Sequence, residues 1–291
     1  MPKLQKLAVA PPLDIRPGQS IELLKALHIL TVDGKMNQDS RRKLKQVYHL
    51  TQFIAPLITQ VVAERGRVNL VDHGAGKSYL GFILYDLLLK SLEQPHHVYG
   101  VDSRAPLVES SRALAAKLGF NDMSFLNLAV AEAITTPELD VPIDIVTALH
   151  ACDTATDDAI RFALEKHAKY IVLVPCCQAE VAAFLRSDMG DAKAAGSIAE
   201  LWRHPIHTRE FGAQITNVLR GLALEAHGYQ VTVTELVGWE HSMKNELIIA
   251  QFKNLPREKP TQRMEDVLRS FGLDGLRGRF MLKPATDAVS K

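Results

Sequence analysis

Residues capable of chemistry gather in two short segments, each directly after a run of apolar residues. The segment 150–157 contains His150, Cys152 and Asp153, and it follows the apolar run 143–149. Cys176 and Cys177 follow the run 170–175, so all three cysteines of the chain lie in these two segments. If the two runs are neighbouring strands of a parallel sheet, the segments meet at its carboxyl edge, where open α/β sheets bind ligands.

Three roles are open for these side chains. A thiolate from one of the cysteines could add to C6 of a pyrimidine and activate C5 as a nucleophile. His150 and the cysteines could instead bind Zn²⁺, but adjacent cysteines reach one tetrahedral ion awkwardly, so no metal is expected. The favoured interpretation is that Cys152, Cys176 and Cys177 pack around a substrate while Asp153 or His150 acts as the general base. Asp153 also stands where it could cap the helix that follows.

A glycine-rich segment, 72–78, follows the apolar run 68–71. Its Gly-Lys-Ser ending is reminiscent of a phosphate-binding P-loop, but that motif needs a glycine where this chain has Val71. The alternative is Asp72-x-Gly74-x-Gly76 between a strand and a helix, where glycines let the backbone approach a ligand and the helix start offers N–H groups. The carboxylate of Asp72 would repel a pyrophosphate, so the segment favours a cationic nucleoside.

A second acid ends the next apolar run. Asp102 follows Gly76 by 26 positions, near the spacing at which a carboxylate accepts both ribose hydroxyls of a nucleoside. NAD would share this geometry, but Tyr79 replaces the third glycine of its fingerprint. S-adenosylmethionine, which carries a sulfonium and an ammonium group, fits better. The residues expected to line its site are Asp72, Gly74, Gly76, Lys77, Asp102, Ser103 and His150.

Two further expectations concern the same site. The side chain of His73 is expected to point away, because the backbone serves the ligand at this loop. No acid follows the third strand at 127–129, so backbone groups are expected to contact the adenine.

Hydrophobic periodicity assigns these segments to an α/β fold with five parallel strands followed by two more. The last two strands are joined by only about eight residues, too few for a helical crossover, so the last strand must be antiparallel to the one before it. Such a seven-stranded, mostly parallel sheet is the Rossmann-like arrangement of class I methyltransferases. The expected strands are 68–72, 98–102, 124–128, 143–149, 170–175, 230–237 and 246–252, and the helices between them are 77–90, 106–118 and 156–167.

Helices are predicted on both sides of this sheet region. Ser20 is expected to cap a helix over 21–30, and Ser40 a second helix that Pro56 should kink or restart. The predicted organisation is an N-terminal helical extension, a catalytic domain with a helical insertion, and a polar tail with a weak helix at 264–271. The respective bounds are 1–64, 65–254 with insertion 179–228, and 255–291.

The amino-acid composition excludes several classes of protein. The 291 residues are 47% hydrophobic and 23% charged, which excludes wholesale disorder. Lys and Arg number 34 against 33 Asp and Glu, so the overall charge indicates neither nucleic-acid nor membrane binding. The longest apolar run, 79–89, is about half the length needed to cross a bilayer and contains Asp86. With three cysteines and no secretory signal, a cytoplasmic location is expected.

The motifs together resemble a known family. Asp72-x-Gly-Ala-Gly-Lys, the segment 150–157 and the Cys176-Cys177 pair are similar to those of the class I methyltransferase group that includes the tRNA acceptor-stem 2′-O-methyltransferase and poorly characterised methyltransferase-like proteins. The resemblance covers about 68–178, and more weakly to 252. It implies that Asp72 and the glycines line the methionine part of S-adenosylmethionine, that Asp102 binds the ribose and that 150–157 faces the acceptor. Two departures are Gln178, where the tRNA enzyme has His, and the absence of its Cys-rich zinc fingers.

The acceptor is predicted from weaker signals. Basic residues cluster at 41–45 and at 203–209, and Trp239 could stack a base, which together favour RNA as the methyl acceptor, at a ribose or a base. A small molecule or a protein side chain is the alternative acceptor. A third possibility is a binding module that keeps the S-adenosylmethionine site without catalysis.

Overall fold

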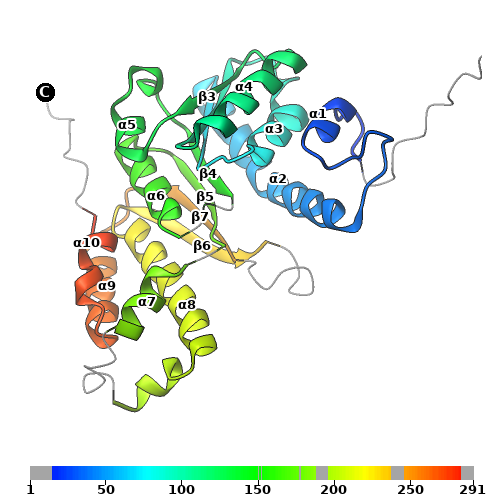
Figure 1. Cartoon of the computed structure of the whole chain (residues 1–291). Coiled ribbons are helices and arrows are strands. Elements are labelled where there is room, and N and C mark those ends of the chain that lie inside the picture. The colour runs from blue at the N-terminus through cyan, green and yellow to red at the C-terminus, as the bar shows by residue number, and fades with distance from the viewer. Residues whose placement is uncertain are drawn as a thin grey trace, which may run out of the picture.

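A single seven-stranded sheet organises the molecule (Figure 1). The computed structural model describes residues 15–149, 151, 153–176, 178–187, 196–236 and 246–282. Within these residues the strand order is β3-β2-β1-β4-β5-β7-β6. The strands are β1 (Val68–His73), β2 (His96–Asp102), β3 (Met123–Asn127), β4 (Ile145–Leu149), β5 (Tyr170–Val174), β6 (Tyr229–Glu235) and β7 (Glu246–Phe252).

Strand directions confirm the predicted topology. The strands β1 to β5 pair with one another in parallel. The strand β7 is antiparallel to both β5 and β6, between which it lies. Consequently the start of β7 at Glu246 lies at the same edge as the ends of β5 and β6, and Glu246 pairs in register with Glu235.

Helices cover both faces of the sheet. Side chains of α1 to α4 join one hydrophobic cluster with the sheet, and side chains of α6 and part of α8 join the cluster on the other face. The α-helices are α1 (Ile21–Ala26), α2 (Gln38–Arg65), α3 (Tyr79–Leu84), α4 (Ala105–Leu118), α5 (Val130–Thr135), α6 (Ala155–Glu165), α7 (Glu180–Ser187), α8 (Pro205–Glu225), α9 (Glu258–Ser270) and α10 (Arg277–Phe280). Shorter helical turns are η1 (Tyr85–Leu89), η2 (Pro137–Leu139), η4 (Gly196–Trp202) and η5 (Asp274–Leu276). No helix in the described ranges is both long and apolar enough to cross a membrane.

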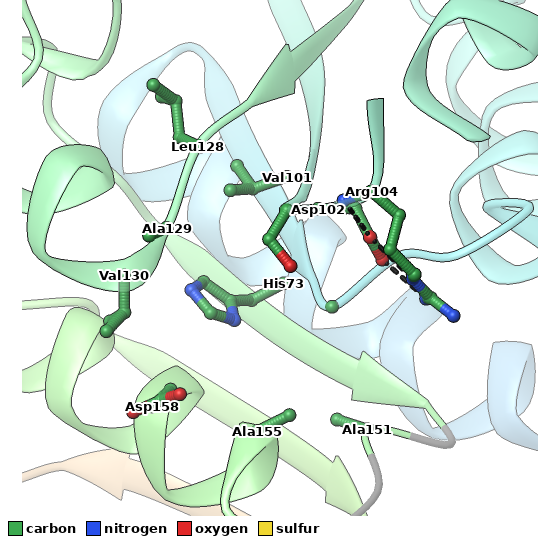
Figure 2. A pocket seen from close by; sticks show the side chains of 12 residues that line it. His73, Val101, Asp102, Arg104, Leu128, Ala129, Val130, Ala151, Ala155 and Asp158 are labelled. Carbon is green, nitrogen blue, oxygen red and sulfur yellow. Dashed lines mark hydrogen bonds and ion pairs between the residues drawn. The ribbon is translucent and has the colours of Figure 1, made fainter. Parts of the chain in front are cut away.

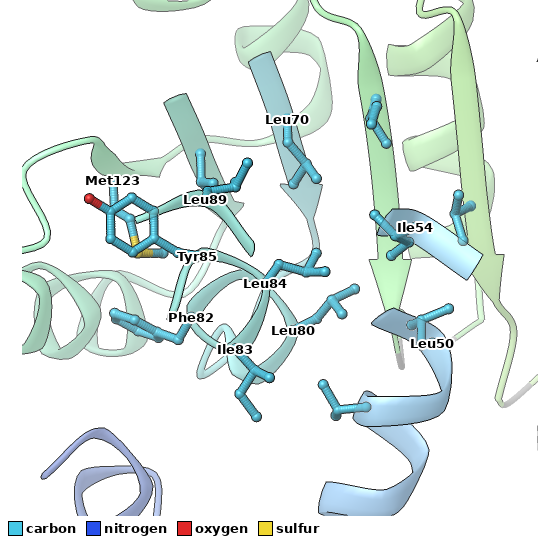
Figure 3. Close-up of a cluster of buried hydrophobic side chains, with 14 of the residues drawn as sticks. Leu50, Ile54, Leu70, Leu80, Phe82, Ile83, Leu84, Tyr85, Leu89 and Met123 are labelled. Carbon is cyan, nitrogen blue, oxygen red and sulfur yellow. The ribbon is translucent and has the colours of Figure 1, made fainter. Parts of the chain in front are cut away.

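The central strands are buried on both faces. In β1, Leu70 belongs to the cluster under α2 and α3, which Figure 3 shows, whereas Val71 belongs to the cluster under α6. All five residues of β5 are buried. Near-continuous apolar runs are what a parallel sheet covered by helices requires, which explains why these strands could be found from hydrophobicity alone.

The N-terminal helices begin at polar caps. Ser20 caps α1, as expected, by accepting a hydrogen bond from the N–H of Leu23 at 3.1 Å. The cap of α2 is Asn37, not Ser40, and its side chain accepts from the N–H of Ser40 at 2.8 Å. The expectation that Pro56 restarts this helix is wrong: α2 continues through it. Buried residues on either side of Pro56, Ile54 and Ile58, hold the helix against the sheet and offset the lost backbone hydrogen bond.

The helix after the glycine loop changes its winding halfway along. The predicted helix 77–90 is an α-helix only to Leu84 and then widens into the π-helical turn η1. Within this turn Asp86 is buried, accepts from the N–H of Ser20 at 2.9 Å and pairs with Lys90 at 2.5 Å. Turns of this kind often occur at functionally or structurally constrained positions, and here the turn contains a carboxylate that ties the start of α1 to η1.

The C-terminal segment folds further than the sequence indicates. Instead of a weak helix at 264–271, α9 extends over Glu258–Ser270. Its buried residues Met264 and Leu268 pack with Phe280 of α10 against α7 and α8. These helices form a third hydrophobic cluster beside the sheet edge that carries β6 and β7.

Candidate cofactor and acceptor cavities

The glycine loop between β1 and α3 turns through three left-handed residues, Gly74, Gly76 and Ser78. Gly74 and Gly76 have φ of 68° and 59°. A Cβ built on Gly74 would lie 3.3 Å from the Cβ of Ala151, so a side chain here would crowd the loop after β4. Two backbone N–H groups of the loop donate to the end of β2: Ala75 to the Val101 carbonyl at 3.1 Å, and Gly76 to the Asp102 carboxylate at 2.8 Å. These two N–H groups were expected to face a ligand, but in this structure they hold the loop against β2.

Asp72 lies beneath α3 and is not among the residues that line the adjoining cavity. Its carboxylate accepts from the Thr147 hydroxyl at 2.9 Å and from the Ser78 hydroxyl at 3.4 Å, and the side chain is fully buried. Burial raises the pKa of Asp72 to about 6, against the lowering effect of hydrogen bonds from Thr147, the Gly81 amide and Ser78. In this structure Asp72 is thus a buried anchor between β1, β4 and α3 and not the expected carboxylate at the cavity edge.

Asp102, at the end of β2, is held on both oxygens. Its Oδ1 accepts from the backbone N–H and the Nε of Arg104 at 2.9 Å and 2.8 Å. Its Oδ2 accepts from the Nη2 of Arg104 and from the N–H of Gly76, both at 2.8 Å. Burial raises the pKa of Asp102, but the bonds from Arg104 and Gly76 outweigh burial and hold it below its usual value. Asp102 is consequently an ionised acceptor, and the side chain of Arg104, which is 62% exposed, covers it from the solvent side.

A cavity of about 350 Å³ opens beside Gly74 and Asp102 (Figure 2). Besides these two, its lining residues are His73, Val101, Ser103, Arg104, Leu128, Ala129, Val130, Ala151, Ala155 and Asp158. Of the sequence-predicted cofactor residues it brings together Gly74, Asp102 and Ser103. Gly76 only braces Asp102, Lys77 is exposed outside the lining, and His150 lies outside the described residues.

This cavity suits a nucleoside cofactor. An ionised carboxylate at its rim can accept from ribose hydroxyls, provided that the exposed side chain of Arg104 moves aside. The apolar side chains of Val101, Leu128 and Val130 offer a surface for a purine ring. The volume lies within the usual range for small-molecule sites.

Sequence reasoning missed one polar residue of this cavity, Asp158, and misplaced the side chain of another, His73. The ring of His73 lines the cavity between Asp102 and Ala155 in Figure 2, so the expectation that it points away is wrong. Asp158, in the first turn of α6, faces the same space, and burial raises its pKa. The position of His73 could have been predicted from β1 itself. Side chains two residues apart in a strand lie on the same face of the sheet, so His73 lies on the face of Val71.

Asp153 caps a different helix from the one that follows it. Its Oδ1 accepts from the N–H groups of Ala179 and Glu180 at 3.0 Å and 3.3 Å, at the start of α7. A carboxylate engaged by a helix N-terminus is well placed to hold the loops after β4 and β5 together. Its predicted role as general base stays a prediction. Cys176 is half-buried after β5, whereas Cys152 and Cys177 lie outside the described residues.

A fully buried arginine links these loops to β7. Arg220 of α8 is paired with the carboxylate of Asp157 through two contacts of 2.8 Å and donates to the Asp153 carbonyl at 2.8 Å. It also donates to Asn217 at 3.2 Å, and Asn217 donates to Glu246 at 2.6 Å. No motif signals Arg220, because its partners come from segments more than 60 residues earlier in the chain.

A second cavity, of about 520 Å³, lies beyond the ends of β5 and β6 and the start of β7. Its polar lining consists of amide, hydroxyl and carboxylate side chains, and none of the described lining residues is Lys, Arg or His. The lining residues are Pro175, Gln178, Glu210, Ala213, Gln214, Asn217, Val233, Thr234, Glu235 and Glu246. Within the part of the chain that the structure covers, no group of three or more His, Cys, Asp or Glu could hold a metal ion.

Comparisons with known proteins found one matching family and several similar structures. Residues 42–184 match the protein family described as "Methyltransferase domain". Among solved structures, M. capricolum TrmK bound to S-adenosyl-homocysteine is 12% identical with a TM-score of 0.40, covering 68% of each chain. An rRNA methylase from Streptococcus thermophilus is 12% identical with a TM-score of 0.41, covering 71% of this chain and 96% of that one.

A third similar structure is magnesium protoporphyrin IX methyltransferase from Synechocystis PCC 6803 with bound S-adenosyl-homocysteine. It is 14% identical with a TM-score of 0.43, covering 79% of this chain and 94% of that one. No curated protein matches the chain. The names of these structures span RNA and porphyrin methylation, and likeness at this level does not extend to a substrate.

Proposed function

We propose that this S-adenosylmethionine-dependent methyltransferase holds its cofactor in the cavity beside Gly74 and Asp102 and binds its methyl acceptor in the second cavity. The enzyme class and the cofactor follow from the methyltransferase domain at 42–184 and the seven-stranded sheet. The observation that carries the placement of the cofactor is the ionised, braced carboxylate of Asp102 at the rim of a nucleoside-sized cavity.

Topology supports the placement of the acceptor. Both cavities open at the carboxyl edge of the parallel strands, one over β1 and β2, the other over β5, β6 and β7. The loops after β4 and β5 run between them and are joined by the Asp153 cap. S-adenosylmethionine, when bound, supplies a methyl group on a sulfonium that a nucleophile can take in one displacement.

The charge of the second cavity favours an amine-bearing acceptor, either a small molecule or a protein side chain. Carboxylates of Glu235 and Glu246 line it together with three side-chain amides, and the carboxylate of Glu210, which also lines it, is paired with Arg209. These groups would attract a protonated amine and orient its N–H bonds, and a carboxylate could accept the proton that the amine loses before attack. A phosphodiester would instead be repelled.

RNA, the acceptor favoured by the sequence, is less well supported by the described surface. Of the basic clusters, Arg203 pairs with Glu200 at 3.2 Å and Arg209 with Glu210 at 3.0 Å. Lys43 likewise pairs with Asp39 at 3.6 Å. Each pair reduces the positive charge that a phosphate backbone would meet.

The proposal is tested by incubating the protein with S-adenosylmethionine labelled in the methyl group and an extract of cells that lack the protein. We expect label in amine-containing small molecules or in protein, and none in nucleosides from digested RNA. Glu235→Gln should reduce this labelling about tenfold, as expected for loss of one charge-assisted hydrogen bond. The matched control Glu165→Gln, at the exposed end of α6, should leave it unchanged. Label confined to RNA nucleosides would contradict the acceptor assignment.

A further inference from the structure

The last residue of β1 places an imidazole inside the cofactor cavity. His73 is 7% exposed, lines the cavity, and lies with its ring 5.5 Å from that of Phe162. Figure 2 shows the ring among the side chains that face the cavity, with Asp102 on one side and Asp158 on the other. Its position is therefore fixed by the strand and by the packed ring behind it.

Both ring nitrogens of His73 are buried without a hydrogen-bond partner among the described residues. Leaving polar atoms of a buried side chain unpaired is unfavourable, and native proteins rarely do so unless another molecule supplies the partner. Burial lowers the pKa of His73 to about 4, against the raising effect of Asp102, so the ring is neutral at physiological pH. A neutral imidazole presents one donor and one acceptor.

The neighbouring carboxylate is already engaged. Asp102 accepts four hydrogen bonds from Gly76 and Arg104, which accounts for its acceptor capacity. Among the described residues no group is left to pair with His73. A nucleoside in the cavity provides complementary groups on both its sugar hydroxyls and its ring nitrogens.

We propose that His73 binds the nucleoside half of the cofactor through a hydrogen bond from the cavity floor. The proposal rests on the proposed placement of S-adenosylmethionine in this cavity. The purine side of the cavity is otherwise walled by apolar residues such as Val101 and Leu128, so His73 adds a polar contact that helps to select an adenosine group over a hydrophobic ligand of similar size.

The experiment measures binding of S-adenosyl-homocysteine and of adenosine by calorimetry, together with the melting temperature of the ligand-free protein. Binding of S-adenosyl-homocysteine to the wild type tests the cofactor site itself. In His73→Leu we expect both ligands to bind about fivefold to tenfold more weakly, the loss of one hydrogen bond. The melting temperature without ligand should rise, since an unpaired buried imidazole has been removed.

A matched control is His227→Leu. His227 is also buried and also has one ring nitrogen without a partner among the described residues, but it lies between α8 and β6, away from the cavity lining. This variant should keep the wild-type affinity for both ligands. If His73→Leu binds both ligands as tightly as the wild type, or loses affinity for S-adenosyl-homocysteine but not for adenosine, the proposal is wrong.

Discussion

The two cavities at the carboxyl edge of the sheet hold their polar groups in opposite ways. In the cofactor cavity the carboxylate of Asp102 is saturated by hydrogen bonds, while the imidazole of His73 has no partner among the described residues. In the second cavity several carboxylates share one space, and Asn217 connects one of them to Arg220. Under the proposed function, this difference means that the first cavity would select its ligand by a few fixed contacts and the second by its negative charge.

The largest effect on stability should come from replacing Arg220, which joins the loop after β4 to Asn217 in the lining of the second cavity. Arg220→Met would leave Asp157 as an uncompensated buried charge and release Asn217, so we expect the free energy of unfolding to fall by about 3–5 kcal/mol. Urea unfolding measures this loss. The double variant Arg220→Met, Asp157→Leu should recover a large part of it. A single variant as stable as the wild type would show that the buried pair does not join the two regions.

The pH dependence of stability should separate two neighbouring residues of β1. The pKa of Asp72 is raised to about 6, so its contribution to stability increases as the pH falls from about 6 towards 4. The pKa of His73 is lowered to about 4, so its contribution decreases as the pH falls from 6.5 to about 4. In the wild type these opposite effects largely cancel.

Single variants should reveal each effect. Relative to the wild type, Asp72→Asn should lose stability as the pH falls from 6.5 to 4, and His73→Leu should gain it. Each change should reach about 3 kcal/mol, from 1.36 kcal/mol per pKa unit. Urea unfolding at half-unit intervals of pH checks this, and parallel pH profiles for the wild type and both variants would contradict it.

Affinity for the cofactor should distinguish Asp102 from Asp72. Asp102→Asn removes the charged acceptor at the cavity rim, so S-adenosyl-homocysteine should bind about 10- to 100-fold more weakly. Asp72→Asn should bind it nearly as well as the wild type, because Asp72 is buried under α3 and is not among the lining residues. Titration calorimetry measures both. Equal losses in the two variants would favour the sequence-based placement of Asp72 at the ligand.

The smallest effect concerns the side chain that covers Asp102. Arg104→Met removes the two side-chain bonds that compete with ribose hydroxyls. Because the Arg104 side chain is 62% exposed and solvent screens its charge, we expect S-adenosyl-homocysteine to bind only about twofold to fivefold more tightly. Weaker binding to this variant would mean that Arg104 contacts the ligand instead of competing with it.

Sequence patterns located the sheet, and they singled out some of the residues that line the first cavity. The central strands are apolar on both faces, so hydrophobic runs located them, whereas β6 is largely exposed and was located by its position before the last connection. The short length of that connection gave the antiparallel direction of β7. Gly74 and Asp102, which line the first cavity, could be singled out because a turn and a strand end leave local signals; their roles in cofactor binding stay predictions. The buried position of Asp72 could not be predicted, because Thr147, which donates to its carboxylate, is 75 residues away in the chain.

Other features depend on contacts that no local pattern records. Pro56 lies within an unbroken helix because packing on both sides outweighs its local effect. Arg220 reaches Asp153 and Asp157 across the domain. The second cavity is formed by three strand ends and α8, so its charge could not be read from any single segment.

A crystal structure of the protein with S-adenosyl-homocysteine tests the central claim most directly. The account predicts the ligand in the cavity between Gly74 and Asp158, with its ribose hydroxyls on Asp102, the guanidinium of Arg104 displaced and the ring of His73 in contact with the nucleoside. A ligand bound elsewhere, or a ribose that makes no contact with Asp102, would contradict it.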